Sequence, residues 1–341
     1  MGGMEKHIYN LSNEENKLGH EVTVFFNKGS KVSHRDVKIT KLPLHSTKPR
    51  ALGILIFYML IVIKLLFKKE KFDIVHIHGD WSSLLCSKII QKLTNSKILA
   101  FSIHDDIKNN YLYKHIFALL LKQVDIIFST GFQAGENIRS LTSKGVYVHP
   151  SGINKIFLES DSIKRSSSTF QIITVANLVA KKNLDLILDI AKELKEITFI
   201  IAGDGKERIK LQTRINSENI DNLILVGYKT PMELKELYRQ SNLFLLTSFF
   251  EGTPTVILEA MASGLPIVCS EAGGINNIVP NYCDLRIVTG FVKEKYIKIL
   301  IEYKVNFEKY TSKKNIQFAN EYDWKKVALK ITSQLSRELL K

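Results

Sequence analysis

Cysteine is scarce in this chain of 341 residues, which holds only Cys86, Cys269 and Cys283. Their number is odd and their spacing fits no metal-binding pattern, which argues against a disulfide framework and a zinc module. We therefore expect a reducing, cytoplasmic compartment. The start of the chain also has no apolar stretch behind a charged segment, so no signal peptide is expected.

Long hydrophobic runs are missing as well. The most apolar stretch, residues 51–63, has 13 residues before Lys64, too few to span a bilayer. Two interpretations remain open, a buried core helix or a helix that lies at a membrane interface. The basic residues that flank the stretch are Lys48, Arg50, Lys64, Lys68 and Lys69.

Acidic residues are too few to balance the basic ones, and the net charge is +14. The excess is uneven: up to residue 150 there are 21 Lys and Arg against 12 Asp and Glu, and beyond it 27 against 22. No RNA-binding motif accompanies this charge, so nucleic acid is not an expected partner. An anionic membrane surface is the better expectation, with the protein peripheral on the inner, cytoplasmic face of the cell membrane.

The length indicates two domains. Short β-branched runs alternate with helical stretches, a pattern typical of α/β folds with parallel sheets and crossover helices. A polar, Ser-rich segment at residues 160–169 is the expected linker, between domains at 1–159 and 170–320, with a closing helix at 321–341. Strands are expected at residues 20–26, 37–43, 73–79, 97–105, 125–130, 145–152, 170–178, 197–205, 223–228, 243–248, 266–274 and 284–288.

Residues 251–260, Glu-Gly-Thr-Pro-Thr-Val-Ile-Leu-Glu-Ala, form the most informative motif. They follow an expected strand, with Thr253 as the expected helix N-cap and Pro254 as the first helical residue. Glu251 then lies at the carboxyl end of the strand, where open α/β sheets bind ligands, and Glu259 lies about a turn and a half into the helix. The two carboxylates can thus reach different parts of one ligand.

Together with residues 261–266 and Gly273-Gly274, this motif resembles the family-4 (group 1) retaining glycosyltransferases, whose signature is two glutamates separated by seven residues. The resemblance covers nearly the whole chain. It implies the GT-B fold, two Rossmann-like domains facing across a cleft, with a last helix that crosses back to the first domain. It also implies sugar transfer from a nucleoside-diphosphate sugar to an acceptor, expected here to be a lipid-linked saccharide in bacterial surface polysaccharide synthesis.

The resemblance assigns roles to individual residues. Glu259 would accept hydrogen bonds from the nucleotide ribose, and Glu251 would orient the transferred sugar. Lys182 would hold the diphosphate beside Asn177, which stands where the family commonly has an arginine. His104 matches a family histidine near the reacting centre. No metal or resident cofactor is expected, because cationic side chains can compensate the charge of a leaving diphosphate. The other expected donor-site residues are Gly2, Gly3, Gly252, Thr253 and Thr255.

Several other residues leave alternatives open. The segment 203–205 and Tyr228 either line the nucleotide pocket or are residues that the turns at these positions require. His78 and Asp80 end an expected strand and are candidates for the acceptor site. His76 and His78 share a face of that strand, but no third ligand follows at metal-binding spacing.

The sequence departs from the family pattern in two places. Asn276-Asn277 stands where relatives often carry Pro-Glu, so a carboxylate is missing near the donor sugar. Gly2-Gly3 resembles the glycine loop that normally follows a first strand, and that strand is central in a doubly wound sheet. We therefore expect a first strand to be missing, encoded by roughly a dozen further upstream residues, of which about 5–6 form the strand.

Two alternative functions remain. One is a sugar-nucleotide epimerase of the GT-B fold. The paired glutamates and the Gly-Gly-Met-Glu start of the chain argue against it. The other is a catalytically impaired protein that binds nucleotide sugars, an alternative that the missing first strand, Asn177 and Asn277 favour.

Overall fold

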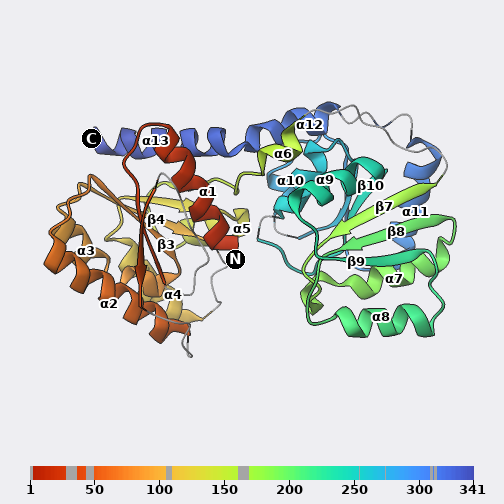
Figure 1. The fold of residues 1–341 in the computed structure, drawn as a ribbon, viewed down its shortest axis with the longest axis horizontal. Coiled ribbons are helices and arrows are strands. Elements are labelled where there is room, and N and C mark those ends of the chain that lie inside the picture. Colours follow the sequence, from red (N-terminus) through yellow and green to blue (C-terminus); the bar gives the residue numbers. More distant parts are fainter. Residues whose placement is uncertain are drawn as a thin grey trace. The chain divides into compact units, whose positions relative to one another are not determined.

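The computed structural model describes residues 3–27, 37–43, 50–104, 110–159, 169–252, 254–272, 274–307, 310 and 313–341. The chain forms two compact units: unit 1 comprises Met1–Gly152 with Trp324–Lys341, and unit 2 comprises Ile153–Asp323. Figure 1 shows their elements in chain order.

The division falls at Gly152/Ile153 and Asp323/Trp324, not at the expected borders after residues 159 and 320. The reason is local: the Ile153 N–H donates to the Tyr322 carbonyl at 2.8 Å, and Ile153 bridges to Asp323. The expected linker, except residue 169, lies outside the described residues.

Unit 2 is built on a six-stranded sheet in the order β12-β11-β10-β7-β8-β9. Every pairing in it is parallel, and its runs of Ile, Leu, Val and Phe suit a sheet that is covered on both faces. The strands are β7 (Phe170–Val175), β8 (Ile197–Ala202), β9 (Leu223–Gly227), β10 (Leu243–Leu246), β11 (Ile267–Ser270) and β12 (Leu285–Val288).

Helices cover both faces of this sheet (Figure 1). Alternate residues of a strand point to opposite faces: Ile172 packs in the core formed with α7, α8 and α11, and Ile173 packs in the core formed with α6, α9, α10 and α12. The helical segments are α6 (Lys155–Leu158), η2 (Ala180–Lys182), α7 (Leu184–Glu193), α8 (Arg208–Ser217), α9 (Pro231–Gln240), α10 (Thr255–Ala262), η3 (Ile275–Asn277), α11 (Lys293–Val305), α12 (Lys313–Ala319) and η5 (Asn320–Tyr322).

Unit 1 contains a four-stranded parallel sheet in the order β3-β4-β5-β6 and a separate parallel pair, β1-β2. Phe101 of β4 packs towards α2, α3, α4 and α5, whereas Ala100 packs towards α1 and α13. The strands are β1 (Thr23–Asn27), β2 (Lys38–Leu42), β3 (Ile74–Gly79), β4 (Ile98–Ile103), β5 (Ile126–Ser129) and β6 (Val146–Val148). The helical segments are α1 (Gly3–Lys17), α2 (Arg50–Lys68), η1 (Trp81–Leu84), α3 (Ser87–Thr94), α4 (Tyr111–Leu121), α5 (Phe132–Arg139) and α13 (Trp324–Leu339).

Each of the twelve runs expected to be strands overlaps one, and β1 extends one residue beyond its expected run, to Asn27. The prediction of an α/β fold with parallel sheets is therefore confirmed. Within the described residues, β1 pairs only with β2, and β3 pairs only with β4. The further first strand stays a prediction. Gly2 lies outside the described residues, and Gly3 opens α1 with no atom within 4 Å of the position that a Cβ would take.

The apolar stretch at residues 51–63 belongs to α2, which has 19 residues. Tyr58, Ile61 and Leu65 on one face are buried in the core of unit 1. In the part of the chain that the structure describes, no helix is long and apolar enough to cross a membrane.

Candidate active site

Lys182 and Glu251 meet at the carboxyl edge of the unit 2 sheet. β7 and β10 are paired and parallel, so the segments that follow them leave the sheet at the same edge. Lys182 in η2 follows β7, and Glu251 follows β10. Lys182 Nζ lies 2.5 Å from Glu251 Oε1, and the two side chains are only 12% and 8% exposed. The strand order therefore brings a cation and a carboxylate together where ligands bind in such sheets.

Hydroxyl groups fix the segment that carries Glu251. Ser248 Oγ donates to Glu251 Oε1 at 2.6 Å, and Thr247 Oγ1 donates to the Asn183 carbonyl at 3.0 Å. Ser270, the last residue of β11, donates through Oγ to the Ser248 carbonyl at 2.6 Å. These three hydroxyls could not be identified from the sequence, because Ser and Thr at strand ends are common and carry no signal by themselves.

Glu259 lies on α10 and is partly exposed. The Tyr238 hydroxyl lies 3.4 Å from Glu259 Oε2, and Tyr238 is fully buried. Burial, followed by the neighbouring Glu259 charge, raises the pKa of Tyr238 well above its usual value, so this phenol keeps its proton. Nothing in the sequence indicated this contact, because a tyrosine among apolar helix residues is usually a core aromatic.

The start of α10 differs from its prediction. Thr255 is the first helical residue, and Pro254 is the N-cap with φ −74° and ψ 89°. That ψ value is not helical, so Pro254 is not at the first helical position. Thr253, the expected N-cap, lies outside the described residues. Gly252 and Thr255 flank the helix start, with Gly252 exposed and Thr255 partly exposed.

The segment 203–205 has a structural role. A Cβ at Gly203 would lie 1.9 Å from the Ala176 carbonyl oxygen, and one at Gly205 would lie 2.4 Å from the Leu178 carbonyl oxygen. Only glycine permits this close approach of the turn after β8 to the turn after β7. Asn177 in the latter turn is exposed, as is Tyr228, so both can reach a ligand from solvent.

Asn276 and Asn277 lie in η3 and are exposed. Asn276 Nδ2 donates to Glu271 Oε1 at 3.3 Å. A carboxylate is thus present beside residue 276, although it comes from the end of β11 and not from residue 277.

Unit 1 gathers histidines at the carboxyl edge of its own sheet. His104, which follows β4, lies with Nε2 3.0 Å from Nδ1 of His78 in β3, and with Nδ1 3.4 Å from Thr130 Oγ1. His7 of α1 packs its ring against His104, with ring centroids 4.9 Å apart, and against Trp324 at 5.2 Å.

Burial keeps His7, His76 and His78 neutral. It lowers the pKa of His7 and His78 well below the usual value and that of His76 to about 3, and neighbouring histidines lower each further. The rings of His76 and His78 lie 4.2 Å apart, as their shared strand face predicted. No group of three or more ligating side chains among the described residues has metal-binding geometry. The Asp80 carboxylate caps η1, accepting from the Ser82 N–H at 2.9 Å.

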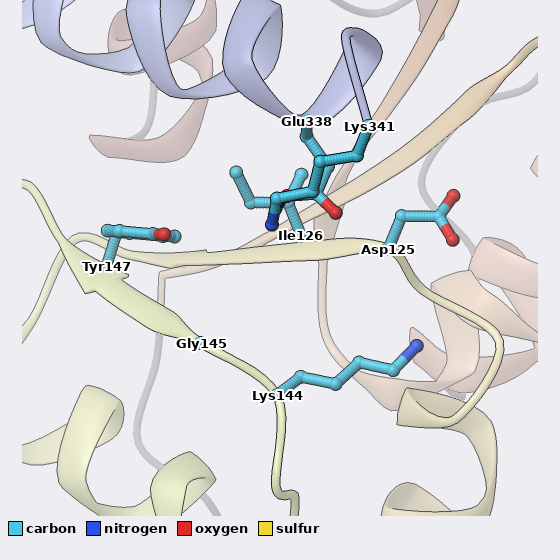
Figure 2. Close-up of a pocket in the computed structure, with 7 residues that line it drawn as sticks. All are labelled: Asp125, Ile126, Lys144, Gly145, Tyr147, Glu338 and Lys341. Carbon is cyan, nitrogen blue, oxygen red and sulfur yellow. Dashed lines mark hydrogen bonds and ion pairs between the residues drawn. The ribbon is translucent and has the colours of Figure 1, made fainter.

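A cavity of about 350 Å³ lies in unit 1 at the amino ends of β5 and β6, the sheet edge opposite to the histidines (Figure 2). Its charged groups already have partners: Lys144 Nζ donates to the Lys122 carbonyl at 3.0 Å, and Lys341 pairs with Glu338 at 2.8 Å. The lining residues are Asp125, Ile126, Lys144, Gly145, Tyr147, Glu338 and Lys341. Because these charged groups are already paired, the carboxyl edges of the two sheets are the better candidates for a functional site.

Two α/β units with parallel sheets, each carrying polar groups at its carboxyl edge, are the components of the GT-B fold. The family model described as glycosyl transferases group 1 matches residues 156–316, and the model described as glycosyltransferase family 4 matches residues 1–155. The chain therefore belongs to the family-4, group 1 glycosyltransferases.

Known proteins support this assignment. The chain is 27% identical over 298 residues to one of the subunits of the Homo sapiens phosphatidylinositol N-acetylglucosaminyltransferase, covering 82% of this chain and 61% of the relative. It is 26% identical over 260 residues to the UDP-Gal:alpha-D-GlcNAc-diphosphoundecaprenol alpha-1,3-galactosyltransferase of Escherichia coli, covering 66% and 64%. The chain thus spans less than two thirds of the length of either relative.

A solved structure shows the same fold. The apo form of a lipopolysaccharide outer core galactosyltransferase matches with a TM-score of 0.79 at 17% identity, covering 99% of this chain and 96% of that one.

Proposed function

We propose that this chain transfers a hexose-type sugar from a uridine diphosphate sugar to a lipid-linked acceptor, with retention of the anomeric configuration. The observation that carries the proposal is the Lys182–Glu251 pair at the carboxyl edge of the unit 2 sheet, with Glu259 on the adjoining helix. The name of the E. coli relative includes UDP-Gal, which supports the choice of nucleotide. Retention rests on the resemblance of the paired glutamates to those of retaining enzymes.

In this proposal each residue contacts a different part of the donor. Lys182 neutralises the diphosphate, and Asn177 offers a neutral hydrogen bond beside it. Glu259 accepts hydrogen bonds from the ribose, and Glu251 accepts them from the transferred sugar. Backbone N–H groups at Gly252 and at the start of α10 favour negative charge. The remaining candidates for donor contacts are Gly2, Gly3, Thr253 and Thr255.

The reaction needs no metal in this proposal, because Lys182 supplies the positive charge that a departing diphosphate requires. The bond from the anomeric carbon to the diphosphate breaks, and the acceptor oxygen forms its bond on the same face. The leaving diphosphate takes the acceptor proton. His104 is proposed to act near the reacting centre, where its ring exchanges the hydrogen bond with His78 for one with the sugar.

The acceptor is proposed to be a saccharide on a lipid carrier at the inner face of the cell membrane, in bacterial surface polysaccharide synthesis. The names of the two relatives support a lipid acceptor, since they refer to phosphatidylinositol and to diphosphoundecaprenol. An enzyme with such an acceptor works best when it docks on the membrane that holds the carrier.

α2 offers a docking surface. The face opposite its buried side remains apolar although it is exposed, with fractions of 49% at Leu52, 51% at Met59 and 85% at Phe67. α3 packs on α2 and adds exposed Ile89, and exposed Leu85 lies just before α3. An exposed apolar patch with basic neighbours is typical of a helix that lies on anionic lipid. The remaining members of this α2 face are Ile63 and Leu66, and its basic neighbours are Lys64, Lys68 and Lys69.

Calorimetry with UDP, UDP-galactose and UDP-N-acetylglucosamine tests the donor class, with GDP-mannose as the matched control. We expect a UDP-sugar to bind and to release UDP in the presence of a chelator. Binding without turnover, with lipid-linked acceptors present, would favour a nucleotide-sugar-binding protein instead. The exposed, neutral Asn177 is the observation that keeps this second function open.

A further inference from the structure

Ser248 lies where it can control the orientation of Glu251. We infer that Ser248 is a positioning residue: it holds one carboxylate oxygen of Glu251 so that the other is presented to the transferred sugar. This inference rests on the proposed function, because it assumes that Glu251 contacts the sugar.

The two oxygens of Glu251 have different surroundings. Oε1 accepts from Ser248 Oγ at 2.6 Å and from Lys182 Nζ at 2.5 Å. Oε2 has no hydrogen-bond partner among the described residues. Among the described residues, Arg239 Nε is the only buried side-chain nitrogen or oxygen without a hydrogen-bond partner. Oε2 has no partner among these residues either, so it is not buried and is accessible to solvent. One oxygen is therefore held and the other is available to a ligand.

Ser248 is itself held by the sheet. It is fully buried in the segment that follows β10, and its carbonyl accepts from Ser270 Oγ of β11 at 2.6 Å. Ser270 is 1% exposed. Because β10 and β11 are paired strands, this bond ties the segment that holds Glu251 to the sheet. Functional groups held on strands are positioned more accurately than groups on free loops.

Lys182 cannot supply this orientation alone. In the proposed function the Lys182 ammonium also contacts the diphosphate, and it shares its three N–H donors between that group and Glu251. Ser248 is fully buried and therefore out of reach of the donor, so its hydrogen bond stays with Oε1 while Lys182 turns towards the phosphate. The hydroxyl thus keeps Glu251 in one orientation through the catalytic cycle.

The test compares S248A with T174V. Thr174 is buried, and its hydroxyl donates to the Leu245 carbonyl at 2.7 Å, a bond between paired strands that does not involve Glu251. Both variants lose one buried hydroxyl, so thermal unfolding measures their structural cost. We expect S248A to lower kcat by roughly 10-fold or more, since a misplaced catalytic group can cost up to about 100-fold. T174V should keep the wild-type kcat.

Calorimetry gives a second readout that needs no turnover. In S248A the affinity for UDP should equal that of the wild type, whereas the ratio of the affinities for UDP-galactose and UDP should fall. S270A should show the same changes to a smaller extent.

An unchanged kcat and affinity ratio in S248A would overturn the inference, and so would losses no greater than those of T174V. E251Q separates this failure from that of the proposed function. If E251Q retains wild-type turnover and affinity ratio, the role of Glu251 itself is wrong, whatever S248A does.

Discussion

Oε1 of Glu251 accepts hydrogen bonds from both Lys182 and Ser248, so a substitution at residue 251 changes the surroundings of two other site residues. When the negative charge of Glu251 is removed, Lys182 loses the carboxylate with which it forms its ion pair. The contributions of Glu251 to sugar orientation and to nucleotide binding can therefore be separated experimentally.

Glu251→Gln should lower kcat by roughly 100-fold, the scale of losing one polar contact that is made in the transition state. Binding of free UDP should not weaken, because the released Lys182 becomes fully available to the diphosphate. Steady-state kinetics and UDP calorimetry check both parts. A parallel loss of UDP affinity and of kcat would show that the roles of the glutamates are divided wrongly.

Glu259→Gln should instead weaken both UDP and UDP-sugar binding. An amide is a poorer acceptor than a carboxylate for ribose hydroxyls, and hydrogen bonds to charged groups contribute about 1.5–3 kcal/mol, which corresponds to roughly tenfold or more in Kd. Tyr238→Phe, which removes only the hydroxyl that contacts Glu259, should give a smaller loss. Equal affinities of wild type and Glu259→Gln for UDP would contradict the ribose assignment.

At the scale of elements, the buried histidines on α1, β3 and the end of β4 make unit 1 sensitive to acid. In the unfolded chain histidine titrates near pH 6.5, whereas the pKa of folded His76 is about 3 and those of His7 and His78 are also lowered. Below pH 6.5 the unfolded state thus binds protons that the folded state does not. Stability is greatest above that pH and falls as the pH decreases.

We expect each of these three histidines to reduce the free energy of unfolding by about 1.4 kcal/mol per pH unit below about 6.5. Tryptophan fluorescence measures this in unit 1 selectively, because Trp81 and Trp324, the two tryptophans of the chain, both belong to it. His76→Gln should reduce the pH dependence. A fluorescence midpoint that stays constant between pH 7 and 5 would refute the prediction.

The α2 face should bind vesicles that contain anionic lipid, and the binding should weaken with salt, because charge attraction is screened within about 10 Å at about 0.1 M ionic strength. Replacement of Lys64, Lys68 and Lys69 by Glu should weaken it further. The matched control replaces Lys155, Lys195 and Lys298, which are residues of unit 2. Equal effects of the two triple variants, in a sedimentation assay, would mean that α2 does not dock.

The elements were largely predictable, because runs of β-branched residues specify strands locally, as in β7 and β8. The contact of Lys182 with Glu251 was not, because spacing within one motif says nothing about distance between strand ends. His7 was missed for the same reason: its partners His104 and Trp324 are remote in sequence. Periodicity also could not show which face of α2 is exposed, since both faces are apolar.

At the scale of the whole molecule, the two units carry residues with different proposed roles. Unit 2 carries most of the residues proposed for the donor, including Lys182, Glu251 and Glu259. Unit 1 carries the other donor candidates, Gly2 and Gly3, together with the histidines and the α2 face proposed for the membrane. The final helix α13 belongs to unit 1 although it follows unit 2 in the chain. The chain passes from one unit to the other after Gly152 and again after Asp323. The isolated bridge between Ile153 and Asp323 joins these two connecting segments.

The most direct test of the proposed reaction is the anomeric configuration of the sugar that is first released from a UDP-sugar, followed by proton NMR in the presence of a chelator. The wild-type protein should release UDP together with the same anomer that the donor contains, and Glu251→Gln should release neither at a comparable rate. Initial release of the opposite anomer, or release that depends on an added divalent metal, would contradict a retaining transfer that relies on Lys182 and Glu251.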